Sequence, residues 1–128
     1  MDRRSFLTRL VPAAALGLAA AQAPLAAGKD AALVITPLAD AVTLISGAGG
    51  NVVVLRSAEG VLLVDGGARA NSPQLLQAVR GIAGTARVHT LFNTHWHADQ
   101  TGSNATLGAA GTRIIAHENT RLWLTTDV

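Results

Sequence analysis

Short apolar runs separated by glycine-rich turns dominate the sequence after residue 41. Runs rich in Val, Ile and Leu predict strands at 42–46, 51–56 and 61–65, with turns at 47–50 and 58–60 between them. Each run is continuously apolar, with little alternation of polar and apolar residues. This pattern is typical of strands that are buried on both faces.

A helical periodicity follows the third strand. Apolar residues at 75, 76, 79, 82 and 83 share one helix face. Ser72 is predicted as the N-cap, Pro73 as the first helical residue and Gly84 as the residue that ends the helix. The remaining pattern predicts a strand at 88–93, a polar loop at 94–103, a helix at 104–110, a strand at 112–116 and a helix at 118–125. This order predicts an α/β fold, α+β-like, in which helices pack against a mixed sheet.

The first 27 residues have the pattern of an export signal. A short basic start precedes an uncharged Ala/Leu-rich stretch that ends in small residues. Arg3 and Arg4, followed by Ser-Phe-Leu, resemble the twin-arginine signature, although Asp2 and Thr8 depart from its usual residues. A general secretory signal is the alternative, and a membrane span ranks below both because the stretch is only mildly apolar.

This interpretation divides the chain into three parts. Residues 1–27 form the signal, 28–41 a linker and first segment, and 42–128 a partial domain that is expected to be truncated at its C-terminus. The expected location is periplasmic or secreted, with membrane contact only through the signal.

Composition excludes two classes of function. The chain has no Cys, so it has neither disulfides nor thiolate metal ligands. Beyond residue 27 it has seven basic and seven acidic residues. Without a surplus of basic residues we expect no binding to nucleic acid.

The candidate chemistry lies in the polar loop. His95, His97 and Asp99 are spaced by two, which in an extended backbone places all three side chains on one side. Imidazole and carboxylate groups together suit zinc and other divalent first-row metals. The loop also follows the carboxyl end of a strand, where open α/β sheets bind ligands.

The whole string Thr94–Gly102, THWHADQTG, resembles the signature of the metallo-β-lactamase fold superfamily. The residues Gly50-Asn51-Val52 resemble its first hairpin, and the run from Val61 to Gly67 resembles its strand ending in Asp-x-Gly. The resemblance implies a four-layer αββα sandwich, of which this chain corresponds to the N-terminal half. It also implies that His95 and His97 bind a first zinc ion, that Asp99 binds a second, and that Asp65 supports the metal loop.

Two departures from the family pattern change these expectations. Gln100 stands where the family has a His that binds the second metal. A neutral amide is a weaker zinc ligand, so the site is expected to hold one or two ions with the second bound weakly. The third His, the bridging Asp and the last His of the family come from its second half and have no counterpart here.

Four other aromatic residues are expected to have structural roles. His117 is expected to start the last helix, and His89 to be a structural or surface residue. Trp96 is expected to project away from the ligands and pack against the sheet. Trp123 lies in an apolar patch of the last helix that needs a partner surface.

The sequence therefore predicts an exported zinc-dependent hydrolase that acts on a small-molecule ester, thioester or lactam. Asp99 would be its catalytic residue if the second metal site is empty, acting as a general base. The alternative is a non-catalytic periplasmic remnant that binds metal weakly. In both cases we expect the uncovered face of the sheet to meet a C-terminal half or a second copy of the chain.

Overall fold

A computed structural model of the chain describes residues 32–84 and 87–126. The predicted export signal, with Arg3 and Arg4, lies outside these residues. Among the described residues no helix is both long enough and apolar enough to cross a membrane.

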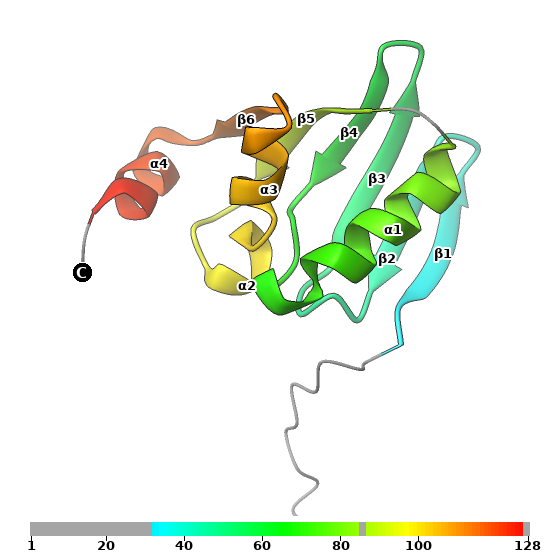
Figure 1. The fold of residues 1–128 in the computed structure, drawn as a ribbon, viewed down its shortest axis with the longest axis horizontal. Helices are drawn as coiled ribbons and strands as arrows, with labels where there is room; N and C mark the ends of the chain where they lie inside the picture. The colour runs from blue at the N-terminus through cyan, green and yellow to red at the C-terminus, as the bar shows by residue number, and fades with distance from the viewer. Residues whose placement is uncertain (1–31, 85–86, 127–128) are drawn as a thin grey trace, which may run out of the picture.

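The described residues form a six-stranded mixed sheet whose strands lie in sequence order (Figure 1). The first four strands pair antiparallel, and the last two join them in parallel. The strands are β1 (Val34–Ala39), β2 (Val42–Ser46), β3 (Val52–Ser57), β4 (Gly60–Val64), β5 (Val88–Asn93) and β6 (Arg113–Ala116). The helices are a 3₁₀ turn η1 (Arg69–Asn71), α1 (Ser72–Ala83), α2 (Ala98–Thr101), α3 (Asn104–Ala109) and α4 (Glu118–Thr125). The predicted α/β class with a mixed sheet is confirmed.

Two elements differ from the sequence prediction. Strand β1 lies within the segment 28–41, where the sequence predicts no strand because Pro37 interrupts the apolar pattern. All six residues of β1 are exposed. As an edge strand it tolerates the proline, and its register with β2 shifts between Pro37 and Ala39. Helix α2 forms inside the stretch that is predicted to be an irregular loop.

The start of α1 also corrects the prediction. Asn71 is the N-cap and Ser72 the first helical residue, so the expected cap is displaced by one position. The Ser72 hydroxyl is buried and lies 2.9 Å from the Ser103 hydroxyl. Ser72 therefore joins the helix to the metal loop, a contact that the local sequence does not reveal.

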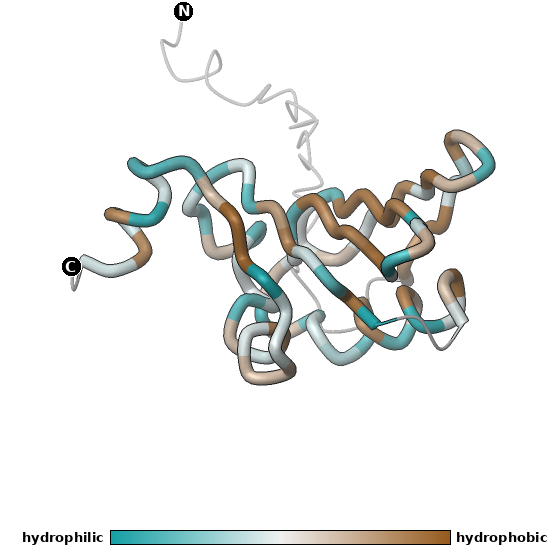
Figure 2. Tube along the Cα trace, turned by 90° about the horizontal axis from the view of Figure 1, so that it is seen from above, coloured by the Kyte–Doolittle hydropathy of each residue, from teal (hydrophilic) through white to brown (hydrophobic). Residues whose placement is uncertain are grey.

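Helices α1 and α3 cover one face of the sheet, and Figure 2 shows them on the same side of the apolar strands. Leu75 and Val79 of α1 and Leu107 of α3 are buried against this face. The core residues that the strands contribute are Ile45, Val52, Val54, Val61, Leu63 and Leu91.

The opposite face carries a continuous apolar row. Leu44, Val53, Val64, Phe92 and Ile115 are neighbours in the registers that join β2 to β6. The first three are half-buried, whereas Phe92 is 43% exposed and Ile115 is 36% exposed. The strands therefore alternate between fully and partly buried positions, and the burial on both faces predicted from their apolar runs is not reached within the described residues.

Two loops meet at the carboxyl end of β4 with almost no space between their backbones. Gly102 donates its N–H to Gly67 O at 2.8 Å, and the Gly66 N–H donates to Gln100 O at 2.6 Å. A Cβ atom at position 102 would overlap the backbone of Ala68 and Arg69. Only glycine fits at this position, because the metal loop lies directly on the loop after β4.

Gly102→Ala is therefore expected to destabilise the fold by about 1–3 kcal/mol, the usual cost of overpacking. The measurement is the free energy of unfolding in urea. Gly81→Ala is the matched control, because a Cβ there meets nothing within 4 Å on the exposed side of α1. The control should gain up to about 1 kcal/mol from helix propensity. Equal stability of Gly102→Ala and the wild type would contradict the close contact between the two loops.

Candidate metal centre

The structure gathers the three predicted ligands beyond the end of β5. One candidate ligand atom from each of His95, His97 and Asp99 lies within 4.8 Å of the other two. His95 is half-buried, whereas His97 and Asp99 are exposed. The three side chains therefore converge at a surface that solvent and a small molecule can reach.

The backbone path that brings them together differs from the predicted one. His97 is extended, with φ −58° and ψ 142°, but Asp99 lies in the first turn of α2. The His97 carbonyl accepts hydrogen bonds from the N–H groups of Gln100, at 2.9 Å, and Thr101, at 3.2 Å. An extended residue followed by a tight helical turn thus replaces the continuous extended loop.

Asp65 connects the end of β4 to the start of the metal loop. Its carboxylate accepts two hydrogen bonds from Thr94, one from the backbone N–H at 2.9 Å and one from Oγ1 at 2.8 Å. Its own N–H donates to Phe92 O at 2.8 Å. Asp65 has φ +66°, a left-handed conformation that is uncommon for a residue other than glycine. Strain of this kind persists only where the surrounding contacts hold the residue in place, as Thr94 does here.

The Thr94 hydroxyl also sets the tautomer of His95. Its oxygen lies 2.8 Å from His95 Nδ1. A threonine hydroxyl has one proton, and Thr94 donates it to Asp65, so its oxygen must accept from His95. Nδ1 of His95 therefore carries the hydrogen, and Nε2 keeps the lone pair that a metal ion requires.

Gln100 lies against the turn between β2 and β3. Its carboxamide occupies the space that a Cβ of Gly50 would need. The Gln100 Oε1 atom is buried and has no hydrogen-bond partner among the described residues. The side chain thus contacts the β2–β3 turn and retains an unused oxygen lone pair.

The remaining residues singled out in the sequence take structural positions. His117 is the N-cap of α4, as expected, and its Nδ1 accepts from the Asn119 N–H at 3.2 Å. His89 is half-buried and pairs with the hydroxyl of Thr90 at 2.8 Å. Trp96 does not pack against the sheet: it is 45% exposed and stacks on Trp123 of α4. The expectation for Trp96 is wrong because α4 folds back beside the loop, which no local pattern indicates.

The sequence pattern assigns no role to Thr94, Asn93 or Ser103. Thr94 is part of the motif, and its position directly before the first histidine is the signal that could have identified it. Asn93 ends β5 and is 1% exposed, and its amide oxygen and nitrogen have no partner among the described residues. Ser103 is fully buried, and its hydroxyl donates to Gly66 O at 2.6 Å. Asn93 and Ser103 are buried by tertiary packing, which the local sequence does not reveal.

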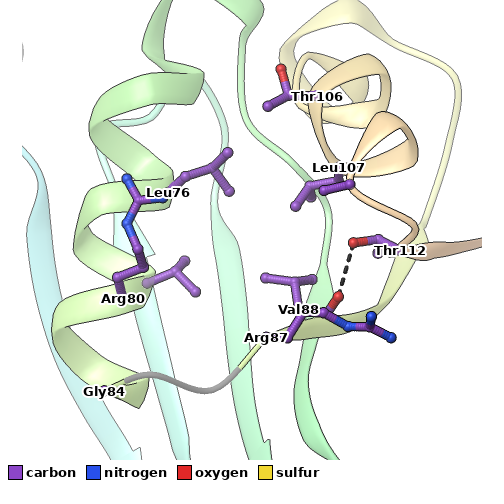
Figure 3. Close-up of a pocket in the computed structure, with 10 residues that line it drawn as sticks. Leu76, Arg80, Gly84, Arg87, Val88, Thr106, Leu107 and Thr112 are labelled. Carbon is purple, nitrogen blue, oxygen red and sulfur yellow. Dashed lines mark hydrogen bonds between the residues drawn. The ribbon is translucent and has the colours of Figure 1, made fainter.

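A groove of about 380 Å³ lies between α1 and α3, away from the metal loop (Figure 3). Leu76, Val88 and Leu107 line it together with Arg80 and Arg87. Val88 begins β5, whereas the metal loop follows its other end. No His, Asp or Glu of the described residues lines the groove, so it has no group suited to metal-dependent hydrolysis.

The donor set fits a divalent ion. The cluster offers two imidazoles for a first ion and a neighbouring carboxylate for a second, and zinc binds both kinds of donor. His95 has the tautomer that this role needs, and its partner Thr94 is itself fixed by Asp65.

Solved structures with a similar fold are metallo-β-lactamases. MEM-A1, a subclass B3 enzyme from a soil metagenome library, is 20% identical with a TM-score of 0.64, over 74% of this chain and 37% of that protein. A metallo-β-lactamase from Cronobacter sakazakii with a HARLDQ motif is 27% identical with a TM-score of 0.60, over 67% of this chain and 35% of that protein. A B3 enzyme with an active-site glutamic acid is 25% identical with a TM-score of 0.62, over 70% of this chain and 35% of that protein.

The chain thus spans little more than a third of the length of these three proteins. No curated protein matches it. The sequence profile described as the metallo-beta-lactamase superfamily matches residues 45–125, which include the strands β3 to β6 and the whole metal loop. The chain belongs to the metallo-β-lactamase superfamily, whose fold implies a divalent metal, usually zinc.

Proposed function

We propose that this chain carries the first metal-binding loop of an exported zinc-dependent hydrolase. The observation that carries the proposal is the convergence of His95, His97 and Asp99 within 4.8 Å at the carboxyl end of β5. Such a cluster can hold a metal ion while leaving a side open for substrate.

Each residue of the loop then has a chemical role. A bound zinc ion supplies a nucleophile from water near neutral pH and polarises a carbonyl or ester oxygen. His95 and His97 hold the first ion, with His95 oriented through Thr94 and Asp65. Asp99 binds a second ion or, where that position is empty, accepts a proton from the attacking water.

The second position is proposed to be the weaker one. Gln100 offers an amide oxygen in place of an imidazole, and its side chain also contacts Gly50. The HARLDQ motif named for the Cronobacter enzyme shares its first, fifth and sixth letters with the run His95–Gln100, HWHADQ. A glutamine at this position therefore accords with a metallo-β-lactamase lineage.

The proposed substrate is a small molecule with an ester, thioester or lactam bond. The similar structures are named as β-lactamases, and a lactam is therefore included among the proposed substrates. We also propose that the apolar row on the uncovered face of the sheet packs against a further sheet, as in an αββα sandwich, or against a second copy of the chain. Phe92 and Ile115 would be covered in such a contact.

One observation favours a second candidate, a metal-binding remnant without catalysis. Among the described residues the cluster holds three groups, two of them exposed, and all three come from one loop. The coding sequence that follows Val128 decides between the two candidates. A frame that supplies a distal His and Asp would support the hydrolase, and a stop codon would support the remnant.

Zinc titration tests the metal site directly. The 128-residue chain is expected to bind one zinc ion with a dissociation constant above about 1 μM, because a single loop supplies its ligands. His97→Ala should weaken binding at least tenfold, whereas Asn119→Ala in α4 should not. Gln100→His should add a second equivalent. Unaltered zinc affinity in His97→Ala would place the site elsewhere, and two tight ions in the wild type would contradict the role given to Gln100.

Thr94→Val removes the hydroxyl that orients His95 while preserving the shape of the side chain. We expect zinc affinity to fall by about 10- to 100-fold, as is typical when the partner of a metal-binding histidine is lost. Thr94→Ser keeps the hydroxyl and should bind zinc like the wild type. Competition with a chromophoric chelator measures the zinc affinity of both variants. A Thr94→Val affinity equal to that of the wild type would refute the tautomer assignment for His95.

Export is tested with a reporter fused to the complete predicted signal and the segment that follows it. Replacing Arg3 and Arg4 together by Lys should retain the reporter in the cytoplasm, because recognition depends on the guanidinium pair. Arg9→Lys, which lies outside the pair, is the control and should be exported normally. Periplasmic delivery of the double variant would favour a general secretory signal.

A further inference from the structure

Successive contacts between aromatic rings connect the last helix to the candidate metal ligands. The indole rings of Trp96 and Trp123 are stacked, with centroids 5.4 Å apart and an interplanar angle of 22°. The Trp96 and His97 rings form a T-shaped pair, with centroids 4.7 Å apart and an interplanar angle of 72°. His97 in turn lies 4.7 Å from His95 in an edge arrangement. The rings thus form one continuous set of contacts from α4 to the metal loop.

Burial in a core does not account for this stack. Trp96 is 45% exposed and Trp123 is 52% exposed, and Leu122 and Leu124 beside Trp123 are exposed as well. Only Thr120 of α4 is buried within the part of the chain that the structure describes. Figure 1 shows α4 at the edge of the molecule, beyond β6. The indole of Trp123 is therefore held beside the metal loop chiefly by its stacking on Trp96.

The metal loop is fixed by hydrogen bonds on both sides of Trp96 but not at Trp96 itself. On one side Thr94 binds Asp65, and on the other the His97 carbonyl accepts from α2. The His95 ring has Thr94 as its partner. The His97 ring has no hydrogen-bond partner among the described residues, so its orientation is limited by the rings of His95 and Trp96.

We propose that Trp123 is a positioning residue for the metal site. By stacking on Trp96 it holds that indole against His97 and thereby keeps the His97 imidazole turned toward His95 and Asp99. Metal-binding histidines usually have their orientation set by a hydrogen bond to a neighbouring group, and here ring packing serves that purpose for His97. The inference rests on the proposed zinc site, because a position for His97 matters only if it binds a metal.

The test compares zinc affinity in three variants of the full chain. Trp123→Ala removes the outer ring of the stack, and its zinc dissociation constant should rise by about 2- to 12-fold, the range that corresponds to loss of an aromatic pair. Trp123→Phe keeps a ring and should recover most of this affinity. Leu122→Ala is the matched control, since Leu122 is an exposed apolar residue of the same helix outside the stack. It should bind zinc like the wild type.

A spectroscopic readout shows whether the stack itself is present. The chain has two Trp residues, so its indole fluorescence and any exciton couplet in circular dichroism arise from this pair. The couplet should be present in the wild type and in Leu122→Ala, and absent from Trp123→Ala and Trp123→Phe. Zinc binding should also change the fluorescence of the wild type, because Trp96 contacts His97.

The outcomes separate this inference from the proposed function. Zinc binding that is the same in Trp123→Ala and the wild type would overturn the positioning role and leave the zinc site standing. A second result would also overturn the positioning role. If Trp123→Ala raises the KM of a longer, catalytically active form of the protein but leaves its zinc affinity unchanged, the stack contacts substrate and does not position a metal ligand. A wild-type chain with the couplet but without zinc binding would contradict the proposed function and, with it, the inference.

Discussion

The carboxylate of Asp65 holds the end of β4 and the start of the metal loop together through two hydrogen bonds to Thr94. The geometry of the candidate site depends on this contact. It fixes the direction in which the chain leaves β5, and it uses the single Thr94 proton so that His95 Nδ1 carries a hydrogen and Nε2 keeps its lone pair. The left-handed backbone of Asp65 is the conformational cost of this arrangement. A carboxylate at the end of β4 thereby selects the tautomer of an imidazole on the loop after β5.

The other end of the metal loop is held by close backbone contact. Gly102 lies on the loop after β4, and Ser103 is buried with its hydroxyl on Gly66 O and beside that of Ser72. The loop is therefore anchored near both of its ends to the same strand-to-helix connection. Between the anchors, the short helix α2 turns the chain so that Asp99 comes back toward the two histidines. The contacts at both ends of the metal loop, together with the turn of α2, therefore bring the three candidate ligands together.

The sheet presents two faces with different environments. One face is covered by α1 and α3 and contains the core, and the other carries the apolar row from Leu44 to Ile115. The metal loop begins where β5 ends, close in the chain to the exposed Phe92.

The sequence by itself determined the class of fold, the bounds of most strands and helices, and the residues of the metal cluster. Those features are local: apolar runs, glycine turns and a motif of adjacent side chains record them directly. The sequence did not indicate β1, because an edge strand need not have an apolar pattern, nor α2, because four residues of a polar loop carry no periodicity. The family resemblance anticipated that Asp65 supports the metal loop. The tertiary structure alone decided that Thr94 links Asp65 to His95, that Gln100 contacts Gly50 and that Trp96 stacks on Trp123. Each of these joins residues from different elements of the fold, and their distance in space is set by the packing of the sheet and its loops, which no local pattern contains.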